Sequence, residues 1–244
     1  MLVVASLSVL TILCWAWIVP MGRDMYGPMT GASAWMMPPS WDAPHLALLF
    51  AMWTVMMAGM MLPSAAPTLL LYARVARSGD DRARTARGIY AFGAGYLVTW
   101  TLFSAAAVLL QRALTALLVL SPMMELRTRT GGAVVLFVAG VYQLTPLKRA
   151  CLDACRSPAA FLVGHWRAGA RGALSMGMRH GWSCLGCCWA LMLLLFAGGV
   201  MNLYTIAAIT GFVLLEKLAP FGAPGGRLSG GFLIGAALWI GWRG

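Results

Sequence analysis

Long apolar segments that contain almost no charged residue constrain this chain more than any other feature. Seven such segments follow one another along the 244 residues: 2–19, 45–74, 89–112, 131–147, 183–201, 203–218 and 229–242. A helix needs about 20 apolar residues to cross the ~30 Å hydrocarbon core of a bilayer. The sequence therefore predicts an all-α fold, a polytopic transmembrane helical bundle with about six to seven spans, as a single transmembrane domain over residues 1–244. Residues 229–242 form the shortest segment.

Composition agrees with a membrane protein and excludes an ordinary soluble domain. Hydrophobic residues make up 61% of the chain and charged residues only 10%, whereas a soluble domain carries about 25% charged residues. The first apolar segment has no basic residue in front of it and no small-residue cleavage site behind it. We therefore expect residues 2–19 to be retained as a span rather than removed as a signal peptide.

The formal net charge of +11 is the next constraint. Lys and Arg lie in the gaps between apolar segments and form no basic face with interleaved aromatic residues, so we expect no nucleic-acid partner and take the lipid bilayer as the partner. If all seven segments span, thirteen of the cations fall on one side: Arg74, Arg77, Arg82, Arg84, Arg87, Lys148, Arg149, Arg156, Arg167, Arg171, Arg179, Lys217 and Arg227. Five fall on the other: Arg23, Arg112, Arg127, Arg129 and Arg243. The positive-inside rule then predicts a cytoplasmic N-terminus.

Five of the six cysteines fall into two groups. Cys151 and Cys155 follow the fourth apolar segment, and Cys184, Cys187 and Cys188 open the fifth. Residues three or four apart share one face of a helix, and the cation count places both groups at the same cytoplasmic end. Thiolates select soft Cu(I) or borderline Zn(II), so this pattern predicts a metal site. Buried cysteines that simply fill space are the alternative.

Methionine is the second signal, with seventeen residues in the chain. In the second apolar segment Met52, Met56 and Met60 recur every four residues, and Met57 and Met61 form an adjacent row. A stripe of thioethers on one helix face can pass a soft monovalent ion, and neutral thioethers favour Cu(I) over Zn(II). Packing is the competing interpretation, because methionine is a common gap-filler in cores.

Several other residues are candidates for a metal pathway. The methionines of the first outer loop can collect an ion; they are Met21, Met25, Met29, Met36 and Met37. Among the histidines, His180 is the best ligand candidate because it directly precedes the second cysteine group, while His45 and His165 are weaker candidates. Glu216 and Lys217 close the sixth segment. Glu216 is expected either to hydrogen-bond to the ligands or to anchor the helix end at the interface.

No enzyme motif stands out in the sequence. There is no phosphate-binding loop and no nucleophile elbow, so we expect the chain not to be an enzyme.

Residues 159–179 are expected to form an interfacial helix with Phe161, Leu162 and Trp166 toward lipid.

Six blocks of the sequence, in order, resemble a bacterial family of predicted metal-binding integral membrane proteins of unknown function, described in places as copper chaperones. The blocks include the methionine-rich stretch, both cysteine groups with their Cys-Leu-Gly-Cys-Cys-Trp core, and Glu216-Lys217; they are residues 52–64, 142–152, 155–158, 181–192, 199–202 and 216–217. The resemblance covers roughly residues 40–220. It implies metal binding by the five grouped cysteines and, with the spans, a multi-pass protein of the bacterial inner membrane.

Three functions remain open from the sequence. The favoured hypothesis is handling of a soft metal, Cu(I), for uptake or delivery: outer methionines collect the ion, the stripe guides it, and the inner cysteines hold it or pass it to a protein partner. The first alternative is a membrane thiol–disulfide oxidoreductase that uses the paired cysteines. The second is an assembly factor in which the cysteines hold a structural Zn(II).

Overall fold

The computed structural model describes residues 2–31, 34, 41–77, 82–218 and 222–243, and over these ranges the chain is all-α. Apart from an isolated bridge between Leu120 and Leu126, no β-structure occurs in them. The helices are α1 (Leu2–Met25), α3 (Ala43–Ala76), α4 (Arg82–Ala116), α5 (Arg129–Leu144), α6 (Pro146–Arg156), α7 (Pro158–His165), α8 (Gly169–Gly198), α9 (Leu203–Leu218) and α10 (Gly222–Trp242). The predicted all-α helical bundle is confirmed.

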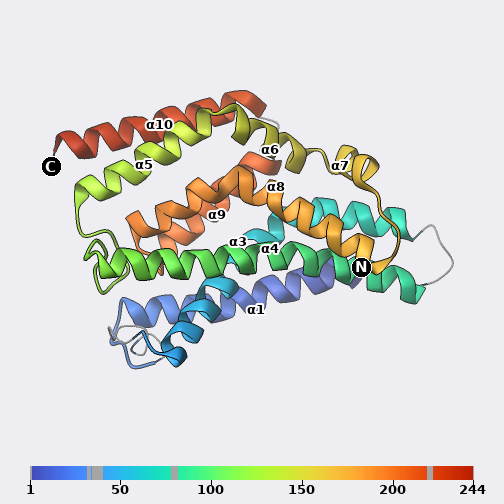
Figure 1. Ribbon diagram of the computed structural model, residues 1–244, viewed down its shortest axis with the longest axis horizontal. Coiled ribbons are helices and arrows are strands. Elements are labelled where there is room, and N and C mark those ends of the chain that lie inside the picture. Colours follow the sequence, from blue (N-terminus) through green and yellow to red (C-terminus); the bar gives the residue numbers. More distant parts are fainter. Residues whose placement is uncertain (1, 32–33, 35–40, 78–81, 219–221, 244) are drawn as a thin grey trace.

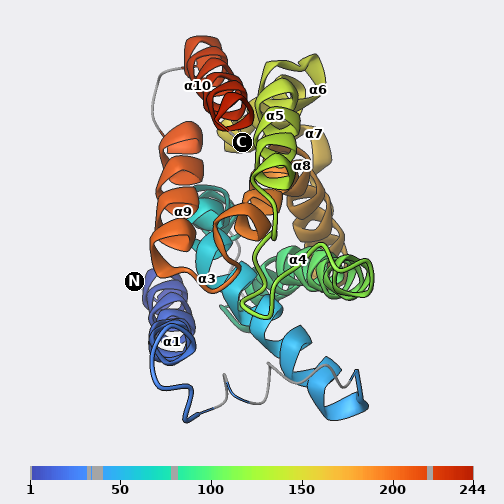
Figure 2. The ribbon, with the colours of Figure 1, turned by 90° about the vertical axis from the view of Figure 1, so that its left-hand side faces the viewer.

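The long helices α1, α3, α4 and α8 run side by side along the length of the molecule (Figure 1). Helix α3 packs between α1 and α4, and α4 packs against α8. Helices α5 and α10 form a pair at one edge of the bundle (Figure 2), and α6 joins this pair to α8. The start of α1 lies at the same end as the connection between α3 and α4, so this end gathers the loop arginines 74–87.

Four of the described helices are long and apolar enough to cross a membrane: α1, α3, α4 and α8. Helices α5 and α6 meet this condition together, bent by 67° at Thr145, which gives up to five spans. The sequence predicted six to seven. The difference lies in α9, which has only 16 residues, and in α10, whose apolar part is the short segment 229–242.

Two helices extend well beyond the apolar segments that predicted them. Helix α8 begins at Gly169, fourteen residues before the expected start at 183, because its amphipathic first half packs on α4. Helix α4 begins at Arg82 and ends at Ala116, beyond both limits of the apolar segment 89–112. The Gln111 side chain is buried and accepts a hydrogen bond of 2.8 Å from the indole N–H of Trp53, which satisfies both groups inside the bundle.

The interfacial helix expected over residues 159–179 is also corrected. Helix α7 covers only its first part, and the second part is the beginning of α8. Phe161 and Leu162 do not point toward lipid, because both are buried in a second core cluster together with Tyr72 and Phe92. Of the three residues expected to face lipid, only Trp166 is exposed.

Helices α4 and α8 approach each other closely through two glycines. A Cβ atom on Gly177 would collide with the carbonyl group of Phe92, and one on Gly95 would collide with the carbonyl of Leu174. Backbone cannot move aside as a side chain can, so only glycine fits at these positions. The close crossing brings Tyr96 of α4 against the middle of α8.

Replacing Gly177 by alanine is expected to destabilise the protein by about 1–3 kcal/mol, the usual range for overpacking. The matched control is Gly231→Ala in α10, where an added Cβ meets nothing within 4 Å. That control is expected to be neutral or slightly stabilising, because alanine is the better helix former. Thermal unfolding in detergent, followed by tryptophan fluorescence, measures both. Equal stabilities of the two variants would contradict the close crossing.

Candidate metal centre

The two cysteine groups meet where α6 packs on α8. Cys184, Cys187 and Cys188 are buried in the main core cluster of the bundle, and Cys151 and Cys155 pack against the same cluster. The Cys155 thiol lies close enough to interact with those of Cys184 and Cys187. Cys151 packs on the backbone of α8, since a Cβ built at Gly186 would lie 2.6 Å from its sulfur. All six cysteines, Cys14 of α1 included, are free thiols.

The cysteines of α8 lie at mid-helix rather than at a helix end. Cys184 is fifteen residues from the start of α8 at Gly169, about 22 Å along the axis at 1.5 Å per residue. The sequence placed this group at the opening of the fifth span, at one membrane face. The position at the opening of a helix is wrong, because the apolar segment starting at 183 is only the second half of α8. The group is therefore enclosed by helices. The position relative to the membrane stays a prediction.

Cys184 is surrounded by polar side chains from three other helices. The Lys217 ammonium of α9 donates a hydrogen bond of 2.8 Å to its sulfur, and the Tyr96 hydroxyl of α4 lies 3.0 Å from the same atom. Ser64 of α3 is 4.0 Å away and accepts a second hydrogen bond of 3.1 Å from Lys217. An ammonium in contact with sulfur favours the thiolate, the form of cysteine that binds metals.

Lys217 is a member of this polar group around Cys184 that the sequence did not predict. It counted as a loop cation or an interfacial anchor, yet its side chain is only 8% exposed. A buried ammonium needs a compensating partner, and Cys184 supplies it. Only its place in the last block of the family resemblance, residues 216–217, pointed to a role for Lys217. No local pattern distinguishes a buried lysine at a helix end from one whose ammonium reaches the membrane surface.

Cys187 and Cys188 both donate to the backbone carbonyl of Cys184, at 3.0 and 2.9 Å. Each thiol thus has a protein partner in this arrangement. Across the described ranges, no group of three or more His, Cys, Asp or Glu side chains is already arranged as a metal-coordination site. Coordination of an ion by these cysteines therefore requires their side chains to rotate away from the Cys184 carbonyl.

His180 lies one helical turn before Cys184 and is 2% exposed. Its ring is enclosed by those of Phe92, Tyr96 and Phe161, with centroids 6.1, 5.8 and 5.2 Å away. Its Nδ1 atom has no hydrogen-bond partner among the described residues. A buried polar atom without a partner is costly, and such atoms often mark a site for an ion or ligand.

Glu216 does not contact the cysteines. Both of its carboxylate oxygens accept hydrogen bonds of 2.6 Å from Lys148, which also donates to Gln143. The side chains of Lys148 and Glu216 are 1% and 7% exposed. Lys148 is therefore not an exposed loop cation. The ion pair of Lys148 and Glu216 holds α6, with Cys151 and Cys155, against the end of α9, with Lys217.

The five methionines of α3 lie in the same core cluster as the cysteines of α8. Met52, Met56, Met57, Met60 and Met61 are all fully buried. Other buried methionines from α1, α8 and the adjoining loops complete the cluster: Met21, Met25, Met124, Met192 and Met201. The row of α3 ends beside the centre, because the Met61 carbonyl accepts hydrogen bonds from Tyr96 and Ser64, at 3.0 and 2.8 Å.

The remaining candidates lie apart from the cysteines. His45 is buried near the start of α3, with its ring against Trp41. His165 ends α7, stacks on Phe161 and makes a hydrogen bond of 3.0 Å to the Phe161 carbonyl. Met29 follows α1 in a half-buried turn. Met36 and Met37 lie outside the described residues.

A family model described as PpoB2, copper chaperone, matches residues 50–240 of the chain. No curated protein and no solved structure matches it. The matched region includes both cysteine groups, the five methionines of α3, and the pair Glu216-Lys217. Because the match covers well over half of the sequence, the chain belongs to the PpoB2 copper chaperone family.

Proposed function

We propose that this membrane protein binds Cu(I) through the thiolates of α6 and α8 and passes it to a protein partner. The observation that carries the proposal is the convergence of five cysteines with ten buried methionines in one core cluster. Soft sulfur ligands select Cu(I) over the harder ions. His180, with its unpaired Nδ1 one turn from Cys184, is the additional ligand from nitrogen.

The methionines of α3 supply a path to the cysteines. Residues 52–61 span about 14 Å of helix at 1.5 Å per residue, and the row ends where Tyr96 and Ser64 touch Cys184. Thioethers bind Cu(I) weakly and thiolates bind it tightly. An ion that enters from the methionine end is therefore drawn toward the cysteines.

Lys217 makes a thiolate at Cys184 compatible with a buried core. A thiolate at Cys184 needs a positive charge beside it, and the ammonium at 2.8 Å supplies that charge. Cu(I) is also a monovalent cation. Its binding leaves the net charge of the core unchanged when one proton leaves the centre at the same time, either from the Lys217 ammonium or from a thiol that becomes a ligand.

The direction of delivery follows from the cations. With Lys148 and Lys217 assigned to the interior, eleven of the thirteen cations remain on the side that holds the α3–α4 and α6–α8 connections, against five on the other. The positive-inside rule then keeps the N-terminus in the cytoplasm of a bacterial cell. The methionine end faces outward and the copper acceptor is a cytoplasmic or membrane-bound protein.

The test is the rate at which the cysteines load with Cu(I). Replacement of all five α3 methionines by leucine keeps their volume but removes the thioethers. We expect this variant to take Cu(I) from a chromogenic chelate about tenfold more slowly, the effect of about 1.4 kcal/mol lost along the path, with unchanged final stoichiometry. Stopped-flow absorbance under anaerobic, reducing conditions follows the transfer.

The matched control is Met176→Leu, a buried methionine of the second core cluster. It is expected to load like the wild type. Equal rates in the five-methionine variant and the wild type would show that the α3 methionines only pack the core. Retention of Zn(II) in preference to Cu(I), or a mixed disulfide trapped with a partner, would instead support the zinc or the oxidoreductase alternative.

A further inference from the structure

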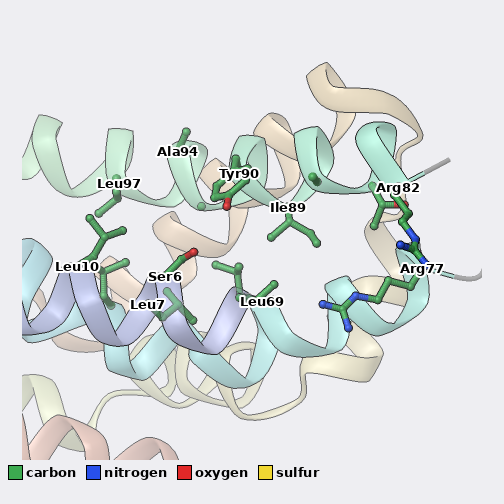
Figure 3. A pocket seen from close by; sticks show the side chains of 15 residues that line it. Ser6, Leu7, Leu10, Leu69, Arg77, Arg82, Ile89, Tyr90, Ala94 and Leu97 are labelled. Carbon is green, nitrogen blue, oxygen red and sulfur yellow. The ribbon is translucent and has the colours of Figure 1, made fainter. Parts of the chain in front are cut away.

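A cavity lies where α1 begins, α3 ends and α4 begins. It has a volume of about 800 Å³ and is bounded by α1, α3 and α4 (Figure 3). Helices α1 and α4 both pack on α3 but make little contact with each other. They therefore leave a groove between them whose floor is α3, and its volume is in the range of ligand pockets.

The groove is lined mainly by apolar side chains and is basic at one end. Leu10 and Leu97 lie toward one end and Leu69 lies between the two ends, while Arg77 and Arg82 extend their guanidinium groups at the other (Figure 3). No acidic side chain in the described part of the chain pairs with either arginine. The surrounding segment 74–87 contains five arginines and two aspartates, so it remains cationic with both aspartates counted.

The length of the groove corresponds to one leaflet of a bilayer. On α3 its lining runs from Leu62 to Arg77 and on α4 from Arg82 to Leu97. Each run covers sixteen residues, and its first and last residues lie about 22 Å apart along the helix at 1.5 Å per residue. Half of a bilayer, headgroup region included, measures about 20–22 Å. The arginines thus stand at headgroup depth when the apolar end reaches the midplane.

We propose that this groove binds one anionic phospholipid, with its phosphate on Arg77 and Arg82 and an acyl chain along α1, α3 and α4. The guanidinium groups form charge-assisted hydrogen bonds with phosphate oxygens. A neutral lipid or an apolar helix would fill the groove but offer no anionic group to the two arginines. This lipid site uses none of the residues assigned to copper, so either proposal can fail without the other.

Native mass spectrometry of the full chain tests the lipid site. Protein in detergent is titrated with phosphatidylglycerol or with phosphatidylcholine of the same acyl chains. We expect one tightly bound phosphatidylglycerol, preferred by about tenfold or more, as hydrogen bonds to charged groups imply. The double variant Arg77→Gln/Arg82→Gln is expected to lose most of that preference.

The matched control is Arg74→Gln/Arg87→Gln, which removes the same charge from the same segment outside the groove. It should keep the preference. A third variant, Gly93→Leu, should lose the bound lipid, because a Cβ at Gly93 lies 3.8 Å from Leu69 and the leucine enters the groove. Leucine is also the better helix former, so this variant should fold.

Three results would overturn the lipid site. Equal affinities of the wild type for phosphatidylglycerol and phosphatidylcholine would show that the groove does not select an anionic headgroup. An equal loss in the control pair would show only general attraction between a basic surface and an anionic lipid. A bound lipid retained by Gly93→Leu would place the acyl chain elsewhere on the protein.

Discussion

A variant with all five grouped cysteines changed to serine is expected to hold no copper after anaerobic loading, whereas the wild type holds it near stoichiometrically. The five are Cys151, Cys155, Cys184, Cys187 and Cys188. Serine keeps the size of the side chain but replaces a soft thiolate by a hard, neutral hydroxyl, which is a poor ligand for Cu(I). Elemental analysis of the purified proteins gives the copper content per chain.

The sixth cysteine provides the matched control. Cys14 lies on α1 against Gly59 of α3, and α1 packs mainly on α3. Cys14→Ser is expected to bind copper like the wild type. Full copper content in the five-cysteine variant would contradict a thiolate site, and loss of copper in Cys14→Ser would show that any cysteine change disturbs the fold.

Single changes should reveal how the centre is organised. Cys184 contacts Lys217 and Tyr96 and interacts with Cys155, whereas Cys151 lies at the edge against Gly186. Cys184→Ser is therefore expected to weaken copper binding more than Cys151→Ser. A competition titration with a Cu(I) chelator ranks the two, and the reverse order would move the centre toward α6.

The second large effect is expected at the buried pair of Lys148 and Glu216. Glu216→Leu leaves the Lys148 ammonium buried beside Gln143 without its counter-charge. Loss of one partner from a buried ion pair typically costs about 3–5 kcal/mol of folding free energy. The variant should unfold at a clearly lower temperature in detergent, and its α6 should lose its fixed position next to α9.

The double variant Lys148→Met/Glu216→Leu is the control. It removes both charges and fills a similar volume, so it is expected to regain most of the stability. Copper content measured in parallel separates two roles. Normal copper binding in the double variant assigns the pair to structure, and a wild-type melting temperature in Glu216→Leu alone would contradict a buried pair.

Much of the fold was predictable because the membrane limits the choices. Long apolar segments without charge have to form helices, since no water is present to satisfy a free backbone. Five of the seven segments lie within one helix of the structure, whereas 131–147 is broken at Thr145 and 183–201 runs three residues past the end of α8. The limits of the helices were less predictable. Gln111 is polar yet buried, and the first half of α8 is polar in sequence yet buries one face in the bundle. Hydropathy alone cannot detect such burial between helices.

The candidate centre was predictable in its sulfur atoms but not in its surroundings. Cysteine and methionine carry their chemistry in the residue type, so helical spacing sufficed to group them. Tyr96, Ser64 and Lys217 come from three different helices. The close crossing of α4 and α8 brings Tyr96 to Cys184, and the packing of α3 and α9 brings Ser64 and Lys217 there. Glu216 was a candidate from the sequence, but its ion pair with Lys148 was not predictable. Lys148 follows a 67° bend that hydropathy does not predict.

X-ray absorption at the copper edge, recorded on the loaded wild-type protein, tests the proposed centre most directly. The edge should be that of Cu(I), and the nearest neighbours of the copper should be mainly sulfur, with at most one nitrogen from His180. The five-cysteine variant loaded in the same way should lack this sulfur signal. A nearest-neighbour shell of oxygen and nitrogen in the wild type, or a Cu(II) edge under reducing conditions, would contradict a thiolate Cu(I) site.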